Sequence, residues 1–403
     1  AYLEHQWNDQ WSGDLQLFSY HSEIGLPGNR KSPGYPQMQD FQRDQTGLIS
    51  PGFSFQPNEN HQFRGFYAYS ENDLRGLTSS AFGQTFNDFQ TRSNQFDLQW
   101  DAQLRDSWLL TTGLSYLNLD FFQTDLNLPV AASPLTDNNW NSWSAFSQLQ
   151  VQFGPAFSIS GGLRYDDYSD FDSPWTGKLT AAYQPGKGPW IFFGEVASAY
   201  SIPQAFDVFG TFGNPTLNAE EMDTLEVGVK FNPDNGRWQV STVAFFNDLH
   251  NLIDFTPQFN TENIGEAETR GLETSLSYSP HEKISLWAQY TYLHAVNQDT
   301  EIRLARRPSH TLQVGFTARW TPEFLMGGEI LGVANREDVD GATFQRIDAD
   351  NYWVARLNAR YSFPNLPLAA TLRIENLFDT NYDPVDGFSA PPLAAYAGLE
   401  TRW

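Results

Sequence analysis

Apolar and polar residues alternate along much of this chain, and residues 393–403 show the pattern most clearly. One face of an extended strand over this stretch is apolar except for a threonine, and it holds Leu393, Ala395, Ala397, Leu399, Thr401 and Trp403. The opposite face carries Glu400 and Arg402. A period of two with one apolar face predicts a strand between an apolar phase and water. The apolar phase is the core in a soluble sandwich, and it is lipid in an outer-membrane barrel, where the terminal aromatic residue would join a girdle.

The same alternation returns at 272–278, 286–292 and 312–320, where each apolar face is backed by a face rich in Ser, Thr, Gln, Glu and Arg. These polar faces are too hydrophilic for a packed interior, so they predict a water-filled lumen. Residues 190–193 are apolar on both faces, which makes the alternation a tendency rather than a rule.

Two kinds of connection separate the strand-like runs. The short ones are rich in Pro, Gly, Asn and Asp and lie at 8–10, 57–60, 105–107, 154–156, 185–189, 232–237, 279–283, 321–323 and 364–367. Longer polar connections come between them, at 25–45, 72–90, 123–141, 201–220, 255–265, 336–349 and 378–392. Short periplasmic turns that alternate with long outer loops are typical of outer-membrane barrels. A sandwich would mix its loop lengths without this parity.

We therefore predict an all-β fold, a transmembrane antiparallel β-barrel that occupies residues 1–403 with roughly nineteen strands. If the last strand runs inward, the strand at 1–7 also runs inward, whereas bacterial barrels begin with an outward strand. An odd number of strands is then expected upstream, and about three more would complete the 22-strand class. The first and last strands are predicted to leave an open edge or to close in an anomalous parallel pair.

Composition narrows the function. The chain has 24 Lys and Arg against 48 Asp and Glu, a formal charge of −24, which argues against a nucleic-acid partner. It has no Cys, so a disulfide framework and thiolate chemistry are excluded. Aromatic residues make up 15% and suit the girdles of a barrel. The tryptophans near the tight turns predict a periplasmic girdle of Trp7, Trp11, Trp100, Trp108, Trp320 and Trp403.

Several motifs resemble the signatures of TonB-dependent outer-membrane receptors. The loop at 199–220 and the strand after it carry the family's spacing at Gly213, Asn214, Pro215, Leu217, Glu220, Glu226 and Gly228, with Ala219 where a proline is usual. Further matches follow in family order at 162–171, at 263–273, at Arg307-Pro308 with His310, and at 372–379 with Tyr382. Each match alone is weak, but together they extend from Gly162 to Trp403.

The resemblance implies a receptor in the bacterial outer membrane that imports a scarce metal chelate, with a ferric siderophore favoured and cobalamin next. Its partners would be outer-membrane lipid, lipopolysaccharide, the chelate and the TonB energy-coupling complex. In the family that complex contacts an N-terminal plug, which is not visible in this sequence. No cofactor and no enzymatic activity are implied. The alternatives are a passive porin or specific diffusion channel, expected near 16–18 strands, an outer-membrane hydrolase with a Ser/His/acid cluster, and a soluble lectin.

Two groups of residues are candidates for ligand binding. The outer loop holds four aromatic residues that could line a ligand funnel or pack the loop onto the rim: Tyr200, Phe206, Phe209 and Phe212. Three arginines cluster before a strand and could meet an anionic chelate: Arg303, Arg306 and Arg307. Such arginines more often pair with anions of the lumen or of lipopolysaccharide, or with carboxylates of a plug.

Metal and catalytic sites are not predicted. Four aspartates, Asp166, Asp167, Asp170 and Asp172, could offer oxygen ligands to Ca²⁺, but their spacing is no EF-hand and favours an acidic, solvated hairpin. The seven histidines lack the paired spacing of a metal site. Nothing marks a nucleophile with its base.

Overall fold

A computed structural model describes residues 1–26, 31, 40–80, 83–128, 136–186, 188–209, 213–233, 236–255, 261–263, 265–340, 342–343 and 345–401. The chain forms one antiparallel sheet of 19 strands, with two small two-stranded sheets beside it. One short helix, α1 (Ala205–Phe209), is present in this part of the chain. No helix among these residues is long and apolar enough to cross a membrane.

The large sheet follows the chain, so that each strand pairs with the next one in order. Its strands are β1 (Tyr2–Gln6), β2 (Trp11–Gly25), β3 (Phe41–Asn58), β4 (His61–Ser80), β5 (Gly83–Arg105), β6 (Trp108–Leu128), β7 (Thr136–Phe153), β8 (Phe157–Tyr168), β9 (Trp175–Tyr183), β10 (Trp190–Ser201), β11 (Glu220–Phe231), β12 (Trp238–His250), β15 (Ala267–His281), β16 (Ile284–Asn297), β17 (His310–Arg319), β18 (Phe324–Ala334), β21 (Tyr352–Ser362), β22 (Leu368–Glu375) and β23 (Ala394–Thr401). The small sheets are β13 (Ile253–Phe255) with β14 (Thr261–Asn263), and β19 (Arg336–Val339) with β20 (Arg346–Ala349).

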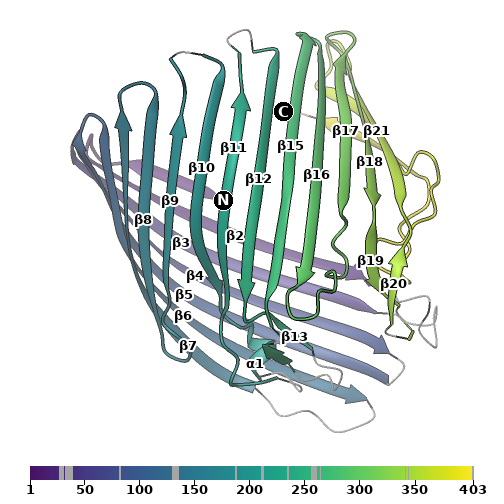
Figure 1. Ribbon diagram of the computed structural model, residues 1–403, viewed down its shortest axis with the longest axis horizontal. Coiled ribbons are helices and arrows are strands. Elements are labelled where there is room, and N and C mark those ends of the chain that lie inside the picture. The colour runs from purple at the N-terminus through teal and green to yellow at the C-terminus, as the bar shows by residue number, and fades with distance from the viewer. Residues whose placement is uncertain are drawn as a thin grey trace.

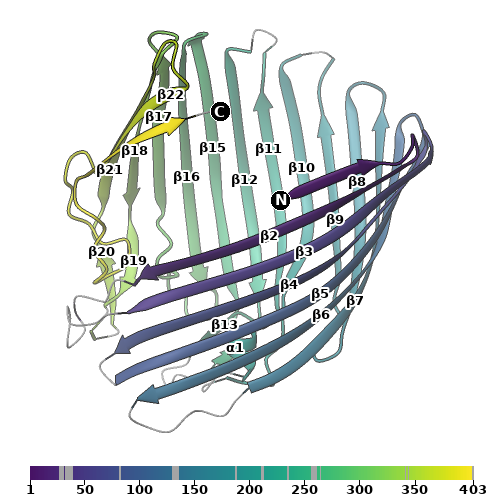
Figure 2. The ribbon, with the colours of Figure 1, turned by 180° about the vertical axis from the view of Figure 1, so that it is seen from behind.

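The sheet curls round until the wall of β2–β7 faces the wall of β10–β16 (Figures 1 and 2). The expected number of about nineteen strands agrees with this sheet. β1 pairs with β2 and β23 pairs with β22, and no ladder joins β1 to β23 within the described residues. Of the two expected outcomes, the open edge is therefore confirmed and the parallel closure is not. The curled antiparallel sheet confirms the all-β barrel fold.

The alternation of connections is confirmed, but two predicted loops are largely strand. Residues 123–141 were expected to form a connection, yet β6 continues to Leu128 and β7 begins at Thr136. Residues 72–90 were expected to form a polar connection, yet β4 and β5 continue through them in an unbroken ladder as far as Ser80 and Gly83. The residues of β5 that point outward explain the error, because they are apolar from Phe96 to Leu104 and polar from Asp88 to Asn94. The apolar part has the length of a membrane crossing. The polar part of β5 carries mostly polar side chains on both faces. It therefore lacks the alternation of apolar and polar residues that would identify a strand.

Aromatic pairs on the outward face mark the two edges of the lipid-facing belt. On the side of the tight turns the rings pair between neighbouring strands, with centroids 4.6 Å apart for Trp190 and Phe231 and 3.8 Å apart for Trp238 and Tyr278. The predicted girdle members Trp7 and Trp320 are exposed on this side, and Trp403 lies outside the described residues. On the loop side the pairs are Tyr116–Trp143 at 4.6 Å and Tyr165–Trp175 at 4.8 Å.

The inward face is polar and is crossed by ion pairs between neighbouring strands. Examples are Arg64–Asp101 at 2.6 Å, Lys178–Glu195 at 2.7 Å and Arg356–Glu329 at 3.0 Å. Pairs as exposed as these contribute little to stability individually. Their presence agrees with the predicted water-filled lumen.

Aromatic rings on this inward wall lie over glycines of the adjacent strand. Phe193 faces Gly228, Phe245 faces Gly271 and Trp287 faces Gly315, each directly opposite in the ladder. A Cβ added to any of these glycines would meet ring atoms within 2.3–2.6 Å, so the glycine provides the space in which the ring lies against the wall. The arrangement keeps bulky side chains flat on the wall.

Candidate functional site

The long connections gather at one end of the sheet, opposite the tight turns, and form the outer rim (Figure 1). The described part of this rim includes residues 169–174, α1 with its flanking loop, the β13–β14 hairpin, residues 298–309, the β19–β20 hairpin and residues 376–393. Binding residues often lie on loops that a rigid scaffold positions. The rim is therefore the candidate ligand-binding region.

Tyr200, the first candidate aromatic residue, stands at the end of β10 and packs inside the rim. Its hydroxyl lies 2.8 Å from that of Tyr168, and the two rings meet edge to face at 6.1 Å. Tyr168 in turn contacts Trp140 and Phe171. These contacts favour the packing role that was the alternative for this residue, although a part in ligand binding remains a prediction.

The other candidate aromatic residues belong to the loop that follows β10. Phe206 and Phe209 lie within α1, and Phe212 falls outside the described residues. The carbonyl of Asp207 accepts hydrogen bonds from Thr261 Oγ1 and from the amide of Asn214, both at 2.8 Å. Because Thr261 is in β14 and only 1% exposed, α1 is fixed to the neighbouring hairpin. Ligand binding by the three phenylalanines remains a prediction.

The three candidate arginines divide into two roles. Arg303 donates to the Oδ1 and carbonyl oxygens of Asn335 at 3.0 and 2.8 Å and to Ser309 Oγ at 2.6 Å. Arg306 donates from Nε to Asp338 at 2.9 Å. Both therefore join segments of the rim to one another. Arg307 is exposed, and it donates a 3.5 Å hydrogen bond to the carbonyl of Arg306.

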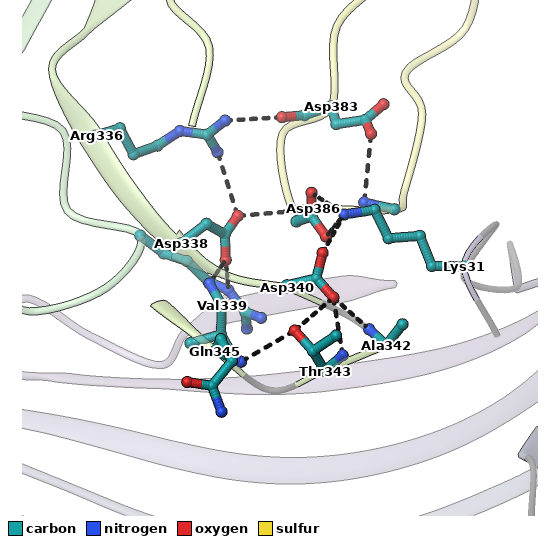
Figure 3. A network of polar contacts seen from close by, with 12 residues as sticks. Lys31, Arg336, Asp338, Val339, Asp340, Ala342, Thr343, Gln345, Asp383 and Asp386 are labelled. Carbon is teal, nitrogen blue, oxygen red and sulfur yellow. Dashed lines mark hydrogen bonds and ion pairs between the residues drawn. The ribbon is translucent and has the colours of Figure 1, made fainter. Parts of the chain in front are cut away.

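Asp338 is the centre of a polar network in the rim, part of which Figure 3 shows. We call Asp338, Arg306, Arg336 and Asp386 the Asp338 cluster. The Asp338 side chain is 0% exposed, and its carboxylate accepts from Arg306, from the Val339 amide at 2.8 Å and from the Asp386 amide at 2.9 Å. The guanidinium of Arg336, 6% exposed, lies 3.8 Å from the same carboxylate.

Arg336 extends the cluster to the loop between β22 and β23. Its Nη atoms donate to the carbonyl of Asp383 at 2.8 Å and to that of Pro384, and the guanidinium lies over the ring of Tyr352 at 5.8 Å. A buried carboxylate thus connects residues 298–309, the β19–β20 hairpin and residues 376–393. These three segments of the rim are held as one unit through these contacts.

Lys31 adds a contact from the segment after β2. Its Nζ lies 2.5 Å from a carboxylate oxygen of Asp340 and 2.7 Å from one of Asp386, as Figure 3 shows. Asp340 also accepts from the amides of Ala342 and Thr343 at 3.0 and 2.8 Å. The hydrogen bond from Lys31, together with these amides, holds the pKa of Asp340 below its ordinary value, and the same two carboxylates raise the pKa of Lys31.

The contacts of Asp338 also lower its pKa. Burial by itself raises the pKa of this carboxyl, but the hydrogen bonds from Arg306 and from the amides of Val339 and Asp386, with the charge of Arg306, outweigh it. The carboxylate is therefore ionised at neutral pH, and the ionised form is the one that connects the rim segments.

We expect the Asp338 cluster to loosen in acid. A carboxyl whose pKa is lower in the folded state contributes stability that is complete above the ordinary Asp pKa of about 3.9 and is lost as the pH falls through the lower folded value. Lys31 has the opposite sign, so its contribution is lost only as the pH rises beyond about 10.4. Hydrogen exchange of residues 336–349, corrected for the intrinsic rate, should show stable protection at neutral pH and loss of protection below about pH 4. Unchanged protection at pH 3 would contradict this expectation.

The acidic hairpin agrees with expectation at Asp167, Asp170 and Asp172, which are exposed, and differs from it at Asp166. Asp166 is 1% exposed rather than solvated, and its carboxylate accepts from Ser144 at 2.5 Å and from Arg164 at 2.7–3.0 Å. These donors neutralise the carboxylate within the wall of β7 and β8. In the described part of the chain, no group of three or more His, Asp or Glu residues is arranged to hold a metal ion.

Sequence reasoning identified Arg306 but missed its partners. Arg336, Asp338 and Asp386 lie in stretches that appeared only as polar loops. Their contacts join residues 32 to 48 positions apart, and the contacts of Lys31 reach across 309 and 355 positions. No local pattern carries such information.

The antiparallel wall, the polar inward face, the lipid-facing belt and the looped outer rim define an outer-membrane transport barrel. Residues 2–377 match the family model described as TonB dependent receptor-like, beta-barrel. The chain belongs to this family, which confirms the expected resemblance. Its members are outer-membrane β-barrels of Gram-negative bacteria that act as receptors and transporters, and they import metal chelates.

Solved structures support the fold. The copper transporter OprC superposes with a TM-score of 0.83 at 14% identity, over 100% of this chain and 70% of its own. The ferric citrate transporter FecA gives 0.81 at 15% identity, over 98% and 68%. The ferric-catecholate import receptor Fiu from K12 E. coli gives 0.73 at 15% identity, over 97% and 72%. At these identities the likeness concerns the architecture.

Proposed function

We propose that this chain forms the wall and the outer capture rim of a TonB-coupled importer of a metal chelate, with a ferric siderophore as the favoured cargo. The observation that carries the proposal is the family match over residues 2–377. Similar structures include a ferric citrate transporter and a ferric-catecholate receptor, which favours an iron chelate over cobalamin. Lipid and lipopolysaccharide surround the barrel in this proposal, and TonB acts through a plug domain.

The proposed mechanism makes and breaks no bond in the cargo. The outer rim captures the chelate, and the polar inward wall gives it a hydrated path once the plug moves. Ion pairs such as Lys178–Glu195 already neutralise parts of this wall, so a charged chelate meets a mixed surface rather than one of a single sign. The passive porin, the alternative function, finds no support in the family match.

Growth of a deletion strain tests the proposal most directly. The strain should lose growth on one ferric siderophore supplied as the sole iron source, and the full-length gene should restore it. Uptake of the same chelate should stop when the proton-motive force is collapsed, which a passive channel would not require. Receptor-dependent growth on none of the iron chelates, or uptake that persists without the proton-motive force, would contradict the proposal.

Arg307 is the candidate arginine whose side chain is best placed to meet an anionic chelate. We expect Arg307→Ala to weaken binding of the chelate about tenfold, because a hydrogen bond to a charged group contributes about 1.5–3 kcal/mol. Thermal stability should stay unchanged, since the guanidinium contacts only a backbone carbonyl. Titration of the purified full-length receptor with the chelate measures the effect. The exposed Arg237, on the side of the tight turns, gives a matched control, and equal affinities for both variants would exclude Arg307 from binding.

A further inference from the structure

A shallow groove crosses the outward face of the wall from β7 to β12, with a volume of about 890 Å³. Its floor contains Gly161 and Gly177. Its sides are formed by large apolar residues that are 38–63% exposed: Leu163, Leu179, Val196, Leu225 and Phe246. The strands that carry them stand side by side at the front of Figure 1.

The register of the strands explains the depth of the groove. Gly161 of β8 lies opposite Leu179 of β9, and Gly177 of β9 lies opposite Leu163 of β8. Each glycine lacks a side chain at a position where the neighbouring strand has a leucine. Backbone atoms therefore form the floor of the groove. The amide of Gly177 donates to Ser198 Oγ at 3.0 Å, which turns that hydroxyl toward the floor.

The aromatic girdles fix the height of the groove in the membrane. On β8, Phe157 stands beside the tight turn and Tyr165 pairs with Trp175 in the girdle on the loop side. Gly161 lies halfway between Phe157 and Tyr165, and Gly177 is two residues from Trp175. The groove therefore runs from the middle of the belt toward the outer girdle, within the outer half of the bilayer.

The surroundings determine what can fill the groove. This face is continuous with the lipid-facing belt of an outer-membrane barrel, so its neighbours are hydrocarbon chains rather than water. If the groove were empty, the atoms that line it would lack dispersion contacts on one side. A flexible hydrocarbon chain can provide these contacts. Its carboxylates, Asp223 and Asp248, lie opposite one another at the outer end, where the belt gives way to polar residues.

We propose that the groove binds one acyl chain of a lipopolysaccharide molecule, with the lipid A headgroup beyond the outer girdle. The apolar sides and the backbone floor fit a hydrocarbon chain, and the position in the outer half of the bilayer selects the lipid of the outer leaflet. Bulk lipid is as apolar as the groove, so the preference for one chain comes from the dispersion contacts that the groove lining offers to an ordered chain. The site is independent of the chelate that the rim receives.

The variant that tests the site is Gly161→Leu, which fills the floor. A Cβ at Gly161 would meet only the Leu179 Cδ1 atom, at 3.5 Å, so an added side chain begins in ordinary contact and extends into the groove. A leucine on a lipid-facing strand also suits the belt, and the barrel is expected to fold. The matched control is Ala244→Leu, at an exposed position on β12 outside the groove.

Native mass spectrometry of the full-length receptor, delipidated in detergent and titrated with hexa-acylated lipid A, measures the binding. We expect one tightly retained lipid A on the wild type and on Ala244→Leu, and at least about tenfold weaker retention on Gly161→Leu. Heat-modifiable gel mobility confirms that each variant is folded. Equal retention by all three proteins would overturn the proposal. If the wild type retained phosphatidylglycerol as tightly as lipid A, lipopolysaccharide would be excluded as the source of the chain.

Discussion

An Asp338→Ala variant should lose the fixed arrangement of the outer rim while the barrel remains folded. The substitution leaves the guanidinium of Arg336, 6% exposed, without its buried counter-charge. It also removes the hydrogen bonds to Asp338 from two other segments, at Arg306 and Asp386, and one from the adjacent Val339 amide. Removal of one partner of a buried ion pair costs about 3–5 kcal/mol. Hydrogen exchange should therefore show faster opening of residues 336–349, and binding of the chelate should weaken as the rim loosens.

Asp348→Ala is the matched control for this effect. Asp348 lies in the same hairpin, opposite Glu337, but its side chain is exposed. Its substitution should change the protection of the hairpin by less than about 0.5 kcal/mol, the usual range for surface positions. If Asp338→Ala and Asp348→Ala open the hairpin equally, the Asp338 cluster does not organise the rim.

A Gly271→Ala variant should impair the wall itself. The added Cβ would lie 2.1 Å from the carbonyl oxygen of Tyr292 and 2.6 Å from the ring of Phe245, so both the ladder and the ring must move. Overpacking of this kind costs about 1–3 kcal/mol. The expected result is a lower yield of folded barrel and a lower unfolding temperature, measured by heat-modifiable gel mobility.

Gly47→Ala provides the comparison on the same sheet. Gly47 lies in β3, and a Cβ at that position meets nothing within 4 Å. The alanine should be neutral or slightly stabilising, because alanine loses less backbone freedom than glycine on folding. A similar loss in both variants would mean that glycine is needed for strand flexibility and not for the close approach of the Phe245 ring.

The fold could be predicted largely from the sequence because the membrane imposes a simple rule. A strand between lipid and water must alternate, and residues 272–278 and 312–320 show the alternation in β15 and β17. The tight turns carry residues that specify them locally, such as Gly154 with a φ of 62°. Strand type, strand number and the parity of connections thus depend on short stretches of chain.

The prediction of strands failed outside the lipid-facing belt, where a strand need not alternate between apolar and polar residues. Residues 72–80 and 83–90 are strand because their backbone groups pair across β4 and β5, and the side chains described there are mostly polar on both faces. Pairs such as Arg92–Glu71 at 3.2 Å join the strands there, but such pairs leave no periodic signal. The Asp338 cluster could not be predicted for a similar reason. Its contacts form only when loops that are distant in the sequence come together around Asp338.

The continuation of β4 and β5 beyond the lipid-facing belt makes the outside of the protein uneven. β5 has 23 residues, of which about the first thirteen lie past the apolar stretch, and at about 3.3 Å per residue and a tilt near 45° they rise about 30 Å above the belt. β9 has 9 residues, and its outer end is its first residue, Trp175, in the outer girdle. A solute that drifts along the cell surface therefore meets a tall barrier on the β4–β5 side, whereas the strand wall on the β9 side ends near the headgroups. A solute therefore reaches the rim more easily from the β9 side than from the β4–β5 side.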